Sequence, residues 1–190
     1  MKLLSKRNLL IMLVLIVLMA ATRMHHFGTS LHLPDASLAV FLLAGFFIAS
    51  PLLFGVLLAE AAALDYVAIT QLGVSDFCVT PAYWFLLPTY AVLWLAGRYS
   101  ARVHQGSLRG LGVFSAISLV AVNVAFVISN GAFYLFSGRY PDVSVAEYTV
   151  RMAQYYVPYV SGAVIYLIPA AMIYALLVRH AGASHAHHAG

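Results

Sequence analysis

Charged residues are scarce in this chain of 190 residues: only 8% are Asp, Glu, Lys or Arg, whereas 63% are apolar. A soluble globular domain carries roughly a quarter charged residues, so the composition excludes an ordinary soluble domain. It also excludes an open disordered chain, because so much apolar surface would not stay solvated. The surplus of basic over acidic residues, 10 against 6, is too small and too scattered for a nucleic-acid surface.

Cysteine is nearly absent, and so are the common catalytic motifs. The one cysteine, Cys78, excludes an internal disulfide and leaves a thiol, a thiolate or a metal ligand. The sequence has no Gly-rich phosphate loop, no His-Glu-x-x-His and no Gly-x-Ser-x-Gly. We therefore expect no nucleotide cofactor and no ATP hydrolysis by the chain itself.

Long apolar runs are what the sequence does have. Since one membrane span needs about 20 mostly apolar residues, we expect a single transmembrane domain over residues 1–190. The predicted fold is all-α, a bundle of six transmembrane helices at residues 3–22, 36–49, 51–72, 81–97, 111–136 and 152–178. Residues 180–190 are expected to be a disordered tail containing histidines. A signal peptide cleaved after Ala21 is the alternative for the first run.

Basic residues indicate the orientation of this bundle. With the N-terminus in the cytoplasm, seven Lys and Arg residues fall on inner segments and three fall on outer loops, namely Arg23, Arg139 and Arg151. We therefore expect both termini in the cytoplasm. Three outer loops, over residues 25–35, 73–84 and 139–159, then carry most of the polar chemistry.

Cys78 lies in the second of these loops, two residues after Asp76 and three before Pro81, which is expected to open a helix. The positive end of a helix dipole would lower the pKa of the thiol and increase its thiolate fraction. This favours a ligand or a nucleophile. The alternative is a buried cysteine that packs as a small hydrophobic residue.

The first outer loop holds three imidazoles, His25, His26 and His32, close to Asp35. Imidazole and thiolate together form a ligand set for transition metals, and these histidines are expected on the same side of the membrane as Cys78. Their spacing matches no structural zinc pattern. A solvated loop in which histidine is merely tolerated is the alternative.

Asp65 lies inside the third apolar run, where an ionised carboxylate without a partner costs at least about 2.5 kcal/mol. It should face the bundle interior, either as a polar contact to a ligand or in an ion pair with a residue such as Arg151 that only holds helices together. Glu60, one turn deeper, is expected to be structural. The tyrosines that follow Arg151 suit an aromatic belt at the membrane interface.

Two segments, HHFGTSLHLPD at 25–35 and VSDFCVTPAY at 74–83, resemble the BtuM family in a chain of matching length and helix number. These bacterial membrane proteins are similar to S-components of energy-coupling-factor transporters, work as solitary proteins and are assigned to vitamin B12 (cobalamin) uptake. The resemblance implies an S-component-like bundle in the bacterial cytoplasmic membrane that binds cobalamin at its outer face. It implies that Cys78 ligates the corrin cobalt and that His26, Asp65, Tyr83 and Arg151 surround the ligand. His25 replaces His26 if the alignment slips by one residue.

The chemistry of cobalamin agrees with a lone cysteine, because the corrin ring already supplies the equatorial nitrogens of the cobalt. A thiolate is a soft donor that can compete with cyanide for an axial position. Given an electron donor from outside the chain, cyanocobalamin bound at Cys78 would lose its cyanide, which would make Cys78 a catalytic residue. We expect the tyrosines and Trp84 to pack on the macrocycle.

The partner of such a protein is left open by the sequence. S-components often dock on an energising module through Ala-x-x-x-Ala in the first helix, and residues 9–22 contain no such pair. Either the chain works without that module or it docks through another surface. A competing interpretation is a membrane thiol enzyme with Cys78 as nucleophile, His26 as base, and Asp76 or Asp65 orienting the base.

Overall fold

The computed structural model describes residues 5–23, 33–103, 107–140 and 144–187. Over these ranges the chain forms six α-helices, one short 3-10 helix and no strand, which confirms the predicted all-helical fold. The elements are α1 (Lys6–Thr22), α2 (Ser37–Phe47), α3 (Pro51–Leu72), η1 (Pro81–Phe85), α4 (Leu86–Val103), α5 (Leu108–Phe136) and α6 (Val145–His187).

Serine residues mark the starts of four helices. The hydroxyls of Ser5, Ser50, Ser107 and Ser144 each accept a hydrogen bond from the amide three residues further on, at 3.1 to 3.4 Å. Each bond satisfies one of the amides that a helix start leaves without an internal partner. At the other end of α3, Gly73 adopts a left-handed conformation with φ of 68°, which glycine reaches without strain.

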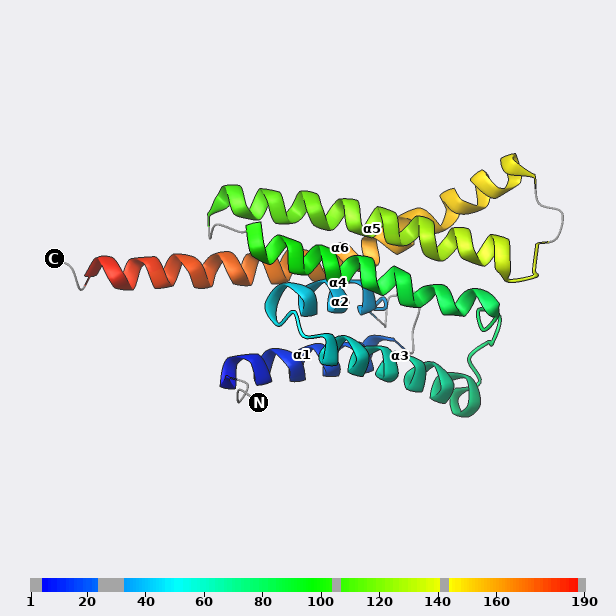
Figure 1. Cartoon of the computed structure of the whole chain (residues 1–190), viewed down its shortest axis with the longest axis horizontal. Helices are drawn as coiled ribbons and strands as arrows, with labels where there is room; N and C mark the ends of the chain where they lie inside the picture. Colours follow the sequence, from blue (N-terminus) through cyan, green and yellow to red (C-terminus); the bar gives the residue numbers. More distant parts are fainter. Residues whose placement is uncertain (1–4, 24–32, 104–106, 141–143, 188–190) are drawn as a thin grey trace.

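Consecutive helices run in opposite directions, so the start of α1 and the end of α6 lie at the same end of the bundle (Figure 1). The same end holds the close of α4 and the start of α5. We call it the basic end, because Lys6, Arg7, Arg98, Arg102 and Arg109 lie there, together with Arg179 of α6. The opposite end carries the connection 73–80 between α3 and η1, and we call it the cysteine end.

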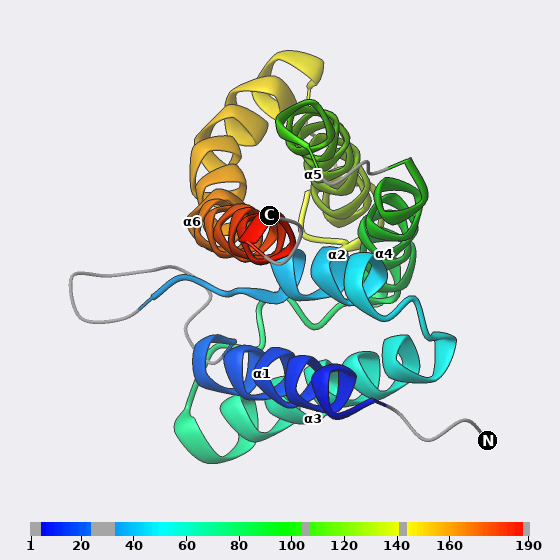
Figure 2. The same ribbon diagram turned by 90° about the vertical axis from the view of Figure 1, so that its left-hand side faces the viewer.

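The short helix α2 lies at the centre of the bundle. In a view along the length of the bundle, α1 and α3 lie side by side, and α2 separates them from α5 and α6 (Figure 2). A Cβ atom added at Gly45 of α2 would lie 2.0 Å from the carbonyl oxygen of Trp94, and one at Gly97 of α4 would lie 2.0 Å from that of Leu42. The two helices are thus in backbone contact, which only small residues permit.

Three helical stretches are long and apolar enough to cross a membrane, namely Pro51–Leu72, Arg109–Phe136 and Val145–Leu176. This supports the prediction of a membrane protein. The 11 residues of α2 rise roughly 16 Å, which is short of a hydrocarbon core of about 30 Å. Six membrane crossings therefore stay a prediction.

Two predicted helices have bounds that differ from those in the structure. Residues 81–97 form η1 and then α4, so the α-helix begins at Leu86 and not at Pro81. Helix α6 begins at Val145 instead of 152 and continues to His187, through most of the tail that we expected to be disordered. Its alanine-rich end favours helix. Pro158 and Pro169 lie inside it, where a missing amide bends a helix, and α6 is bent along its length (Figure 1).

Candidate functional site at the cysteine end

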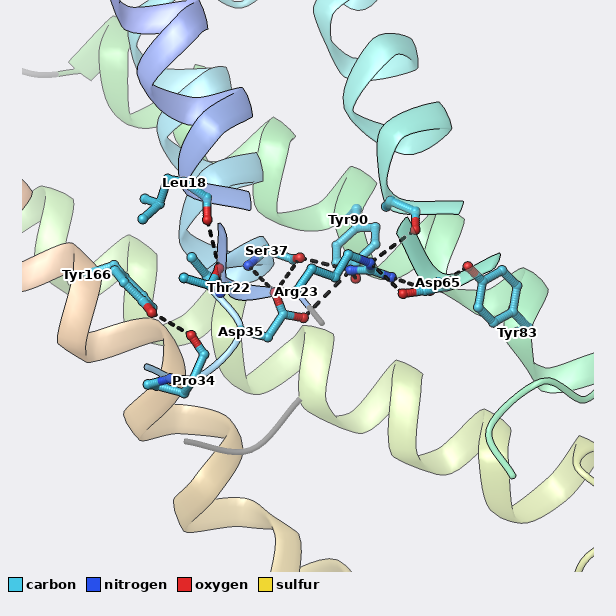
Figure 3. A network of polar contacts seen from close by, with 12 residues as sticks. Leu18, Thr22, Arg23, Pro34, Asp35, Ser37, Asp65, Tyr83, Tyr90 and Tyr166 are labelled. Carbon is cyan, nitrogen blue, oxygen red and sulfur yellow. Dashed lines mark hydrogen bonds and ion pairs between the residues drawn. The ribbon is translucent and has the colours of Figure 1, made fainter. Parts of the chain in front are cut away.

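A buried arginine is the centre of the polar contacts in the bundle. Arg23 directly follows α1 and is 2% exposed. Its guanidinium donates to the carboxylate of Asp65 on α3 twice, from Nε to Oδ1 at 2.8 Å and from Nη2 to Oδ2 at 2.7 Å (Figure 3). Its Nη1 donates to the hydroxyls of Ser37 and Tyr90, each at 2.8 Å, and its Nε also donates to the carbonyl of Ala61 at 3.2 Å. Arg23 thereby joins α1 to α2, α3 and α4.

Two further residues complete this Arg23 network. The phenol of Tyr83 on η1 donates to Oδ2 of Asp65 at 2.7 Å (Figure 3). The carboxylate of Asp35 lies 3.6 Å from Nη1 of Arg23 and accepts hydrogen bonds from the backbone amide and the hydroxyl of Ser37. A buried ion pair offsets the cost of desolvation only when its remaining polar atoms are also bonded, and this condition is met here.

The structure contradicts the ion pair between Asp65 and Arg151, which was one alternative from the sequence. Asp65 pairs with Arg23, which the sequence places among the cations of the outer loops. The signal that points to Arg23 is its position: it follows the first apolar run without a spacer, and an intramembrane carboxylate needs a nearby cation. Tyr90 and Asp35 were also missed as members of the network.

Cys78 lies in a tight loop at the cysteine end, in the connection from α3 to η1. The amide of Val79 donates to the carbonyl of Asp76 at 2.8 Å, and that of Thr80 donates to the carbonyl of Cys78 at 3.1 Å. The amide of Tyr83 donates to the carbonyl of Thr80 at 2.8 Å. These bonds connect the cysteine loop to Tyr83, and hence to the Arg23 network. Cys78 is exposed and its thiol is free.

The predicted lowering of the Cys78 pKa by a helix dipole is wrong. Pro81 opens a 3-10 helix of 5 residues, and α4 begins only at Leu86, whereas the dipole acts within the first turn of a helix. Surrounding atoms exclude part of the water from the thiol, and this burial raises its pKa. The charge of Asp65 raises the pKa further, and the Arg139 guanidinium lowers it. The free thiol is therefore mostly protonated at neutral pH.

Arg139 brings a positive charge to the cysteine loop. Its guanidinium carbon lies 4.8 Å from the centroid of the Phe77 ring, immediately before Cys78 in the chain. The Phe77 ring contacts Phe133 of α5 at a centroid distance of 5.6 Å. A cation over an aromatic face is attracted by the ring electrons. These contacts hold the cysteine loop against the end of α5. Arg139 was not among the site residues predicted from the sequence.

Arg151 belongs to a different cluster. Its Nη2 lies 2.9 Å from Oε1 of Glu147, one turn earlier on α6, and its guanidinium carbon lies 5.0 Å from the centroid of Tyr140. Tyr140 stacks on Tyr134 of α5 at 4.7 Å. Within the described ranges the structure thus joins Asp65 to Tyr83 and places Arg151 outside the Arg23 network. A contact between Arg151 and a ligand stays a prediction.

Other predicted site residues are placed less fully. His26, its alternative His25, and His32 lie outside the described residues. Trp84 on η1 is 79% exposed, so the protein leaves most of its indole uncovered. An apolar groove of about 250 Å³ between α5 and α6 does not include Cys78 in its lining; it lies around Phe114, Ser118 and Val164.

Comparison with known proteins assigns no family to the chain. No protein-family model matches it, and no curated protein matches it with significance. The resemblance to the BtuM family therefore rests on the two loop motifs at 25–35 and 74–83, and what it implies about ligand and transport enters below as a proposal.

Proposed function

We propose that the chain binds cobalamin at its cysteine end and carries it across the bacterial cytoplasmic membrane, with the Cys78 sulfur as an axial ligand of the corrin cobalt. The observation that carries this proposal is an exposed, free thiol at one end of an apolar helical bundle, in a loop bonded to the Arg23 network through Tyr83. The resemblance in the loop motifs supplies the identity of the ligand.

The chemistry of the loop fits a single axial ligand. Because the corrin supplies the equatorial nitrogens, a single axial donor from the protein is sufficient to ligate the cobalt, and a thiolate is a soft donor of this kind. Because the free thiol of Cys78 is protonated at neutral pH, ligation releases a proton. Ligand exchange is a route to cyanide loss that, unlike the reductive route expected from the sequence, needs no electron donor: the thiolate forms the cobalt–sulfur bond, cyanide leaves as an anion, and the oxidation state of the cobalt is unchanged.

The Arg23 network gives the loop its fixed position. Tyr83 bonds to Asp65, whose carboxylate is held by the buried Arg23, so hydrogen bonds connect η1 to the interior of the bundle. Sites of this kind depend on neighbouring hydrogen bonds to hold the ligating side chain. His26 and Arg151 complete the proposed contacts to the vitamin.

The proposed topology has six crossings, both termini in the cytoplasm and the cysteine end outside. The basic residues at the opposite end support this orientation, because cytoplasmic segments carry an excess of Lys and Arg. The protein works either without an energising module or with one that docks away from α1.

A thiol enzyme is the weaker function for this site. A nucleophilic cysteine acts as a thiolate and is normally assisted by a lowered pKa, whereas burial and Asp65 raise the pKa of Cys78. The base proposed for that enzyme, His26, lies outside the described residues.

Purification from cells grown with cobalamin tests the proposed function. We expect a pink to red protein whose visible spectrum shows corrin bands at near-equal amounts of vitamin and protein. A colourless protein that also takes up no added cobalamin would exclude the proposal and favour the thiol enzyme. A Soret band would indicate haem instead.

A further inference from the structure

Glu60 is a half-buried residue whose carboxyl group the proposed site does not use. It is the tenth residue of α3, one of the helices apolar enough to cross a membrane. Both of its side-chain oxygens are shielded from solvent, and neither has a hydrogen-bond partner among the residues that the structure describes. An ionised carboxylate in that state is costly at membrane depth, whereas a protonated one carries no charge to solvate.

The charges around Glu60 do not neutralise it. Helices α1 and α2 pack against α3. Helix α2 contains no titratable residue, and the basic residues Lys6 and Arg7 lie at the far end of α1. Among the residues that the structure describes, Arg23 is the cation whose charge acts on Glu60, and its Nε donates to the carbonyl of Ala61, the next residue of α3.

The positive charge of Arg23 is already compensated. The guanidinium makes two hydrogen bonds with Asp65 and lies 3.6 Å from the carboxylate of Asp35. An ionised Glu60 would therefore add a third negative charge beside a single cation. The two acidic residues of α3 thus differ: Asp65 has an ion pair and hydrogen bonds, whereas Glu60 has neither within the described part of the chain.

We propose that Glu60 is a proton-binding site, which holds a proton in this conformation and releases it when water or the guanidinium of Arg23 gains access to its carboxyl group. The proton passes from outside water to a carboxylate oxygen of Glu60, and no electrons move.

Glu60 is connected to the cysteine end through the Arg23 network. Tyr83 bonds to Asp65, Asp65 bonds to Arg23, and the field of Arg23 reaches Glu60. A ligand that changes the bond between Tyr83 and Asp65 changes the field at Glu60, and by linkage the proton on Glu60 changes the affinity for that ligand. Resting on the proposed function, this makes cobalamin uptake proton-coupled, with the proton moving inward beside the vitamin.

Infrared spectroscopy of the ligand-free protein tests the proton site without cobalamin. The chain has two glutamates, so Glu147→Gln leaves Glu60 as the sole one. We expect this variant, labelled with carbon-13 at the glutamate carboxyl, to show an isotope-shifted carboxylic-acid C=O band at neutral pH. Glu60→Gln should lack that band. Absence of the band in labelled Glu147→Gln would overturn the proton site, and this result does not depend on whether Glu60→Gln folds.

Uptake of radiolabelled cyanocobalamin into proteoliposomes tests the coupling. With one proton per vitamin, each unit of acid-outside pH gradient permits up to about tenfold accumulation. We expect the gradient to drive accumulation in the wild type and in Glu147→Gln but not in Glu60→Gln, which should still bind the vitamin. Wild-type uptake that does not change with the pH gradient would overturn the coupling. So would uptake by Glu60→Gln that responds to the gradient as strongly as uptake by the wild type. A wild type that binds no cobalamin would contradict the proposed function, and the infrared result would still decide the proton site.

Discussion

At the scale of single residues, Arg23 is the centre of the polar contacts in the bundle interior. Arg23 is 2% exposed, and its guanidinium donates to a carboxylate, two hydroxyls and a carbonyl of four different residues. A buried guanidinium is always charged, so each hydrogen-bond acceptor around it replaces part of the water that would otherwise solvate that charge. Loss of one acceptor should therefore cost more than an average hydrogen bond.

Substitution Asp65→Asn tests the importance of that pairing. It leaves Arg23 charged and buried, with Asp35 as the nearest remaining carboxylate at 3.6 Å. Breaking a buried pair from one side costs about 3–5 kcal/mol, so we expect a fall of about 3 kcal/mol in the free energy of unfolding in detergent. Glu147→Gln, which breaks an exposed pair within α6, should change it little. Equal stability of the two variants would contradict a structural role for the Arg23 network.

The reactivity of Cys78 with iodoacetamide should follow its raised pKa. Because only the thiolate reacts, we expect the rate to rise with pH through a midpoint above the value of about 8.5 for a free thiol. Arg139→Gln should move the midpoint higher, since the guanidinium lowers the pKa, and Arg98→Gln at the basic end should not move it. Because the thiolate is also the form that ligates cobalt, ligation by Cys78 should likewise increase as pH rises. A midpoint below that of a free thiol would show that the loop favours the thiolate.

At the scale of helices, the contact between α2 and α4 limits which residues the centre of the bundle accepts. Gly45→Ala and Gly97→Ala would each place a Cβ atom 2.0 Å from a backbone oxygen of the other helix, so the helices would have to separate. We expect a clear loss of thermal stability in both variants. Gly55→Ala in α3 is the matched control: its Cβ would meet nothing within 4 Å, and alanine favours helix by about 0.5–1 kcal/mol. A Gly45→Ala protein as stable as Gly55→Ala would contradict the close packing.

The helices also show what the sequence could predict and why. The bounds of α3 were predictable, because Ser50-Pro51 and Gly73 are local signals for its start and end. The 3-10 start before α4 was not, since Pro81 is compatible with either kind of helix. The partner of Asp65 was missed because Arg23 is 42 residues away in the chain and meets it only through tertiary packing. The local loop motif singled out Cys78 and Tyr83; the structure shows that Tyr83 bonds to Asp65, and the role of Cys78 as a ligand stays a prediction.

At the scale of the whole molecule, the distribution of charge predicts how the bundle sits in a membrane. The basic end should face the cytoplasm and the cysteine end should face outward. Since Cys78 is the sole cysteine and is exposed, a membrane-impermeant thiol reagent should label intact spheroplasts at that residue. Added cobalamin should block the labelling. Labelling that requires access to the inner face would show that the orientation is reversed.

The visible spectrum of bound cobalamin in the Cys78→Ser variant tests the central claim most directly. Serine exchanges a soft sulfur for a hard, protonated hydroxyl at nearly the same volume, so the fold should survive while the cobalt bond is lost. We expect bound vitamin to remain, held by burial of its apolar surface, with a spectrum shifted toward that of free cobalamin. Val79→Ala in the same loop should keep the wild-type spectrum. A Cys78→Ser spectrum identical to that of the wild type would show that Cys78 does not ligate cobalt.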